Sequence, residues 1–69
     1  MKTKKIELDE KETTILTYLA SGYIGKEIAE LIGCSQGNIR RILYGMCAKT
    51  GAFDKATLIA WGFRNKILK

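Results

Sequence analysis

Apolar residues recur along this chain with the spacing of amphipathic helices, in four stretches separated by glycines or capping residues. Asp9 and Glu12 have capping-box spacing, Ser35 and Asp54 are expected to cap later helices, and Gly51 is expected to end the third. The predicted helices span about residues 10–21, 26–32, 35–50 and 56–68. Their inward faces predict the core. They carry Ile15, Leu16 and Leu19, with Tyr18 as a further candidate; Ile28, Ala29, Leu31 and Ile32; Ile39, Ile42, Leu43 and Met46; and Leu58, Ile59, Gly62 and Phe63.

The second and third helices have the spacing of a helix-turn-helix motif. Ala29 is small enough to let the two helices cross closely, Gly33 four residues later suits a left-handed turn, and Ile39 follows six residues after that. We therefore expect an all-α domain of four helices in which residues 26–50 form the helix-turn-helix.

The outward face of the third helix has the chemistry expected of a DNA-reading surface. Arg40 and Arg41 lie there with no carboxylate, and arginine is the commonest partner of guanine in the major groove. We expect the two arginines to contact bases or phosphates, and Tyr44 to stack on a sugar or to donate to a phosphate, unless its ring is partly buried. The outward set is completed by Gln36 and Gly37.

Two amides and a lysine near the helix starts are further candidates. Gln36 and Asn38 can bind bases or backbone, although both also suit a solvated helix start with local hydrogen bonds. Lys26 lies in the first turn of the second helix, where backbone N–H groups favour an anion; phosphate contact and simple solvation both remain open.

The fourth helix is apolar on a second side. Besides the inward stripe, a second stripe at helical spacing consists of Thr57, Ala60, Trp61 and Arg64. A surface helix needs only one buried face, so an exposed Trp61 predicts a partner, most simply a second copy of the chain. The alternative is that Trp61 folds back onto its own domain.

The charge distribution strengthens the nucleic-acid interpretation. The net charge is +5; residues 1–30 hold five lysines against six acids, whereas residues 31–69 hold seven basic residues against Asp54 alone. Residues 1–7 have no apolar period and are expected to form a flexible basic arm, in which Lys2, Lys4 and Lys5 can add phosphate contacts. Residues 8–69 form the expected domain.

Composition argues against several other classes. Two cysteines and no histidine disfavour a zinc site. The sequence contains no nucleophile–base pair and no glycine-rich phosphate loop, so we expect neither an enzyme nor a cofactor. Cys34 and Cys47 could form a disulfide, but two small apolar residues in a reducing cytosol is the simpler interpretation. Without a leader pattern or an apolar run of membrane length, we expect a cytoplasmic, nucleoid-associated protein that does not bind membranes.

The order of these features resembles the LuxR/FixJ/GerE-type helix-turn-helix domain of bacterial regulators. The resemblance runs from Leu8 to about Leu68 and is most specific in LDEKETTILTYLASG, KEIAELIG and ATLIAWGFRNKIL; the length is like that of free-standing GerE-like members. It implies DNA binding through the third helix and dimerisation through the fourth. By position, it places base contacts on Arg40, Arg41 and Tyr44, phosphate contacts near Lys26, Ser35, Gln36 and Asn38, and dimer contacts on Thr57, Ala60, Trp61 and Arg64.

The leading prediction is a sequence-specific transcriptional regulator that binds double-stranded DNA as a homodimer. RNA polymerase or a larger regulator is a further candidate partner. The alternative is a small protein-interaction module that heterodimerises with a larger LuxR-type regulator through the last helix. Salt-dependent DNA affinity discriminates between the two, because phosphate binding releases counterions.

Overall fold

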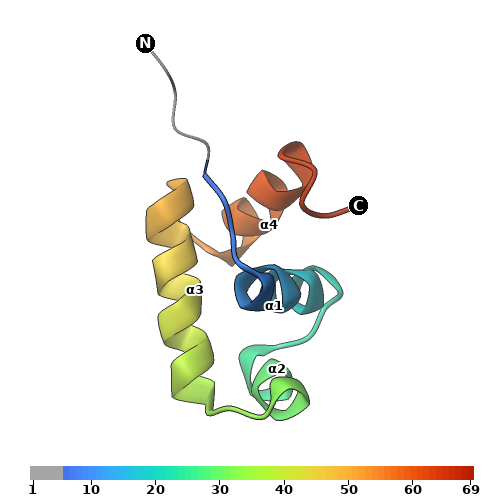
Figure 1. Ribbon diagram of the computed structural model, residues 1–69, viewed down its shortest axis with the longest axis vertical. Coiled ribbons are helices and arrows are strands. Elements are labelled where there is room, and N and C mark those ends of the chain that lie inside the picture. Colours follow the sequence, from blue (N-terminus) through green and yellow to red (C-terminus); the bar gives the residue numbers. More distant parts are fainter. Residues whose placement is uncertain (1–5) are drawn as a thin grey trace.

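The computed structural model describes residues 6–69 and contains four helices within them, with no strand. The helices are α1 (Glu10–Ala20), α2 (Gly25–Ile32), α3 (Gln36–Thr50) and α4 (Lys55–Arg64). α1 packs against each of the other three, whereas α3 packs against α2 near one end and α4 near the other (Figure 1). The predicted all-helical class is confirmed; Lys2, Lys4 and Lys5 of the expected basic arm lie outside the described residues.

Every helix boundary predicted from a cap is confirmed. The backbone N–H of Glu12 donates to Asp9 Oδ1 over 2.8 Å, and the N–H of Asp9 donates to Glu12 Oε1 over 3.0 Å. Ser35 Oγ accepts from the N–H of Asn38 over 3.1 Å, and Asp54 Oδ1 from that of Thr57 over 2.9 Å. At the other ends, Gly33 (φ 75°) and Gly51 (φ 81°) adopt the left-handed conformation that costs glycine little.

The start of α2 lacks a side-chain cap, unlike the starts of the other three helices, because Ile24 occupies its N-cap position. Isoleucine has no side-chain acceptor, so only half of a capping box remains: the N–H of Ile24 donates to Glu27 Oε1 over 3.0 Å. A missing side-chain cap costs about 1 kcal/mol, which packing of Ile28 and Ala29 must offset.

One continuous core joins all four helices, and it corrects the predicted face of α2. The buried residues are Ile15, Leu16, Leu19, Ile28, Ala29, Ile39, Leu43, Met46, Leu58 and Leu68. Leu31, predicted to be inward, is 52% exposed. Successive helix residues are about 100° apart, so a buried arc that contains Ile28, Ala29 and Ile32 leaves Leu31 at its edge. Ile32 and Ile42 are only half-buried.

The chain beyond α4 folds back instead of continuing the helix to residue 68. Lys66 takes a positive φ of 62°, and the N–H groups of Ile67 and Leu68 donate to the carbonyl of Gly62 over 2.9 and 3.0 Å. Leu68 thereby becomes buried over Gly62; a Cβ at Gly62 would stand 2.8 Å from Leu68 Cδ1 and 3.0 Å from Leu16 Cδ2. Glycine is therefore what allows α1, α4 and the C-terminal segment to meet.

The two stripes predicted on α4 are each wrong in part. Leu58 and Gly62 face the core, but Phe63 is 49% exposed. On the other stripe Ala60 and Arg64 are exposed. Trp61 was expected to be exposed, but it is half-buried. Thr57 is also half-buried, and its hydroxyl donates to Asp54 Oδ1 over 2.7 Å. The outward face of α4 is centred on Ala56, Ala60 and Phe63, because Leu58 and Gly62 define the opposite side.

Lys49, in an ion pair that the sequence did not predict, ties α3 to the first turn of α1 and to the segment before it. Lys49 Nζ lies 2.8 Å from Glu12 Oε1 and donates to the carbonyl of Glu7 over 3.3 Å. A surface pair of this kind contributes about 0–1 kcal/mol. The pair also changes the surface charge of α3, because it neutralises Lys49, one of the three cations of that helix.

Candidate nucleic-acid interface

The outward face of α3 is polar and is left uncovered by the other helices. Gln36, Gly37, Arg40, Arg41 and Tyr44 are all exposed, as predicted. Tyr44 is 70% exposed, so its partial burial, the alternative interpretation, is wrong. The opposite face is held by three buried side chains, Ile39, Leu43 and Met46, which fix the rotation of the helix about its axis.

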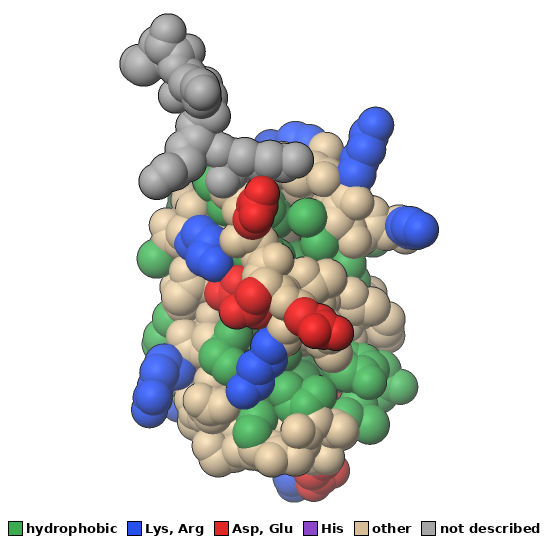
Figure 2. Space-filling view, in the orientation of Figure 1, with side chains coloured by type: hydrophobic (Ala, Val, Ile, Leu, Met, Phe, Trp, Pro, Cys, Tyr) green, Lys and Arg blue, Asp and Glu red, His purple; other side chains and the backbone are tan. Residues whose placement is uncertain are grey.

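Arg40 and Arg41 have no acidic partner on this face among the described residues. Within residues 6–69 neither guanidinium forms an ion pair or donates a hydrogen bond, whereas Lys49 is paired with Glu12. α3 contains no acidic residue. In Figure 2 acidic side chains gather mainly in the middle of the view, with a basic side chain among them, whereas other Lys and Arg side chains stand at the left margin, where α3 runs, and at the upper right. The arginines are therefore available to an anionic partner.

The remaining predicted contact residues lie around the start of α3. Gly25 and Gln36 both line a surface hollow beside α3. The first turn of α2, which carries the exposed Lys26, therefore adjoins the first turn of α3. Ser35 is occupied as a cap, because its hydroxyl accepts from the N–H of Asn38. Asn38 is half-buried. Of these residues, Lys26, Ser35 and Gln36 are exposed, and Gln36 lines the hollow together with Arg40.

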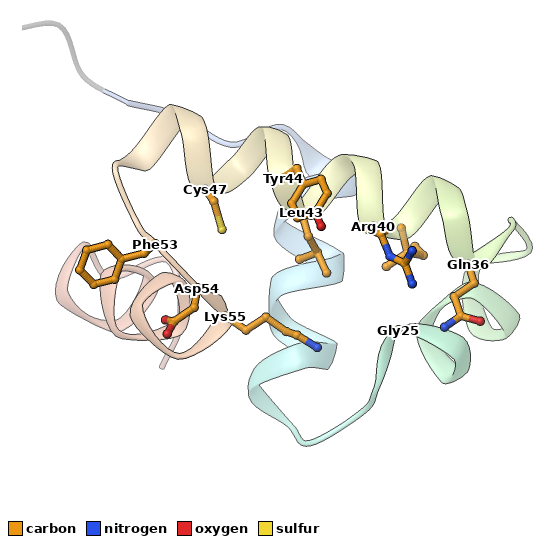
Figure 3. Close-up of a pocket in the computed structure, with 10 residues that line it drawn as sticks. Gly25, Gln36, Arg40, Leu43, Tyr44, Cys47, Phe53, Asp54 and Lys55 are labelled. Atoms are coloured by element: carbon orange, nitrogen blue, oxygen red, sulfur yellow. The ribbon is translucent and has the colours of Figure 1, made fainter.

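The same hollow reaches along α3 to the start of α4. It has a volume of about 380 Å³ and arises where α3 bridges α2 and α4, which do not touch each other. Figure 3 shows Arg40, Leu43 and Cys47 pointing into it from α3, with Lys55 reaching in from α4 and Phe53 beside the α4 start. The complete lining is Gly25, Gln36, Ile39, Arg40, Leu43, Tyr44, Cys47, Phe53, Asp54 and Lys55.

Sequence reasoning missed Phe53 and Lys55 as members of this surface. Phe53 is 88% exposed, although it is a large apolar residue. Residues 51–54 show no regular spacing of apolar residues from which burial or exposure of Phe53 could be predicted. Lys55 was counted only as one of the basic residues. A Phe directly before a capping Asp and a Lys, in the short link between two predicted helices, is the sequence pattern that could have drawn attention to both.

Two ionisable groups in the hollow have shifted titrations. Burial, and secondarily the negative charge of Asp54, raise the pKa of the Cys47 thiol above its ordinary 9.0. Hydrogen bonds from the backbone N–H and then the hydroxyl of Thr57 lower the pKa of Asp54 below 3.8. Cys47 is therefore a neutral thiol at neutral pH and Asp54 a carboxylate. Cys34 and Cys47 are free, so the disulfide considered from the sequence does not form.

Other kinds of site receive no support from the structure. Over residues 6–69, no cluster of three or more His, Cys, Asp or Glu side chains is placed to hold a metal ion. None of the helices in this range combines the length and the apolar character needed to cross a bilayer. Comparisons of the chain with protein-family models, with curated proteins and with solved structures give no match. The resemblance to LuxR/FixJ/GerE-type domains therefore stays a prediction from the sequence.

Proposed function

We propose that this protein binds double-stranded DNA by placing α3 in the major groove, and that it regulates transcription in this way. One observation carries the proposal: the outward face of α3 holds Arg40 and Arg41 exposed, without an anionic partner among the described residues. Burying two such charges in a protein interface would require matching carboxylates, whereas DNA supplies phosphates and guanine acceptors together.

The dimensions of α3 suit this role. Its 15 residues give a length of about 22 Å, and the exposed side chains from Gln36 to Tyr44 occupy about 12 Å of it. The major groove is about 12 Å wide and admits one α-helix. Because the N-terminal half of α3 carries the arginines and adjoins Lys26 on α2, that half is the part we place deepest in the groove.

A homodimer completes the proposal, with α4 as the contact. Ala60 and Arg64 of the predicted dimer stripe are exposed, and Phe63 adds a half-exposed aromatic ring beside them, while Thr57 and Trp61 lie at its edge. Small and aromatic residues on one helix face suit a twofold contact between two copies. Two α3 helices would then reach successive major grooves about 34 Å apart.

The test is fluorescence anisotropy of the full chain on duplex DNA of about 30 base pairs, long enough for two half-sites, across a series of salt concentrations. We expect the logarithm of the association constant to fall linearly with the logarithm of salt concentration, with a slope of about −0.9 per phosphate neutralised. Absence of binding at low salt, by a protein that circular dichroism shows to be helical, would refute DNA binding and favour the heterodimer alternative.

Gly37 provides a second prediction. It is exposed on the outward face of α3, and a Cβ there would meet no atom within 4 Å, so the fold tolerates a larger side chain. Replacement by Ala and by Leu should leave the midpoint of urea unfolding unchanged or slightly raised, since both are better helix formers than glycine. DNA affinity should fall in the order Gly, Ala, Leu, because each added carbon holds the helix further from the groove. Equal affinities across this series would place Gly37 outside the interface.

A further inference from the structure

We infer that the part of the hollow between α3 and the start of α4 holds the sugar–phosphate backbone of the DNA strand at the edge of the occupied groove. Lys55 would contact a phosphate there, and the Phe53 ring would pack on a deoxyribose. This inference rests on the proposed function, because the hollow is continuous with the α3 face through Arg40 and Tyr44, which belong to both. It adds two contact residues that lie outside the helix-turn-helix.

The exposure of these side chains supports an external partner. Phe53 is 88% exposed and Tyr44 70% exposed, so two aromatic rings border one hollow without being needed for packing. Exposed aromatic rings lose apolar hydration when they bind, and a deoxyribose or base offers a face of matching size. Rings bordering a concave strip beside a cationic helix are better suited to a sugar–phosphate chain than to a compact globular partner.

The charges of the hollow favour an anion on balance. Lys55 is exposed, forms no ion pair among residues 6–69, and extends into the space that Arg40 also enters (Figure 3). Asp54 opposes a phosphate, but its Oδ1 accepts both the backbone N–H and the hydroxyl of Thr57, so that oxygen is directed to the first turn of α4. The positive end of the α4 dipole offsets part of its charge.

The occupant is therefore a polyanion with apolar faces along a continuous strand, and not an isolated small anion. The two cations stand on different helices, α3 and α4; Tyr44 lies on α3 one turn from Arg40, and Phe53 stands at the far end of the hollow, next to the start of α4 (Figure 3). A ligand must therefore extend along the strip to meet all four side chains. Successive phosphates and sugars of one DNA strand do so without any change in the docking of α3.

The experiment compares four single variants of the full chain in the salt series described above. Lys55→Gln should weaken binding about five- to tenfold near 0.1 M salt and make the salt slope shallower by about 0.9, the loss of one phosphate contact. Its matched control is Lys69→Gln, the same charge change on the C-terminal segment, which lies on the side away from α3 (Figure 1). That control should leave both affinity and slope within error of the wild type.

The other two variants test the ring and the opposing carboxylate. Phe53→Ala should weaken binding about three- to tenfold with the slope unchanged, because it removes apolar contact and no charge. Asp54→Ser keeps a capping oxygen for Thr57 but removes the negative charge, and should tighten binding about two- to fivefold. Far-UV circular dichroism of each variant confirms that the helices persist.

The outcomes separate this inference from the proposed function. If Lys55→Gln and Lys69→Gln have equal effects, or if Asp54→Ser does not tighten binding, the strand does not run through the hollow, although DNA binding through α3 stands. If the wild-type chain binds no DNA at low salt, both proposals fail together.

Discussion

Replacing Arg40 and Arg41 together by alanine is expected to weaken DNA binding about 30- to 100-fold near 0.1 M salt and to make the salt slope shallower by about 1.8. Both guanidinium groups are exposed and form no ion pair or hydrogen bond within the described part of the chain. Alanine is the best helix former, so α3 should keep its length and the protein its unfolding midpoint. The measurements are fluorescence anisotropy for affinity and far-UV circular dichroism for helix content.

The matched control removes two positive charges that do not belong to α3. Lys11→Ala with Lys69→Ala lowers the net charge by the same amount on α1 and on the C-terminal segment. If non-specific attraction by net charge were the cause of binding, this control would lose as much affinity as the double arginine variant. We expect less than about threefold, because neither lysine lies on the α3 face that enters the groove, and salt screens exposed charges that make no direct phosphate contact.

Leu16→Ala is expected to lower the free energy of unfolding by about 2–5 kcal/mol. Leu16 is completely buried and packs where α1, Gly62 and Leu68 meet, so the methyl groups removed leave a cavity that flexible surface cannot fill. A domain of 69 residues has a total stability of only about 3–10 kcal/mol, so this variant should be partly or largely unfolded at 37 °C. Urea denaturation followed by circular dichroism measures the loss.

Leu31→Ala is the control with the same chemistry. Leu31 is 52% exposed on α2, and its truncation should cost less than about 1 kcal/mol. The apolar spacing of the sequence places both leucines on inward faces, so equal losses would mean that Leu31 is packed in solution and that the burial seen for α2 is wrong.

Helix starts and ends follow from local interactions and could be predicted from the sequence. Asp9, Ser35 and Asp54 begin helices because a side-chain oxygen meets an N–H group three residues later, and Gly33 and Gly51 end them because glycine tolerates a positive φ. The inward and outward faces of α3 follow from its own period of 3.6 residues. These features depend on neighbours within a few positions, so spacing alone predicted them.

Contacts between segments that are distant in the sequence depend on how the helices pack, and spacing along the chain did not predict them. Leu31 and Phe63 are exposed because neighbouring helices cover only part of each predicted face, which no single helix period reveals. The chain reversal at Lys66 is stabilised by the burial of Leu68 over Gly62. Likewise, the pairing of Lys49 with Glu12, 37 residues apart, depends on how the helices pack.

The candidate interface divides in the same way. Its α3 face was predictable, since exposure of Arg40 and Arg41 follows from burial of Ile39 and Leu43 on the same helix. The hollow that adds Phe53 and Lys55 exists because α2 and α4 pack on α3 without meeting each other. The positions of α2 and α4 on α3 are set by the core that all four helices share. The hollow therefore depends on the packed helices and could not be predicted from any one stretch of sequence.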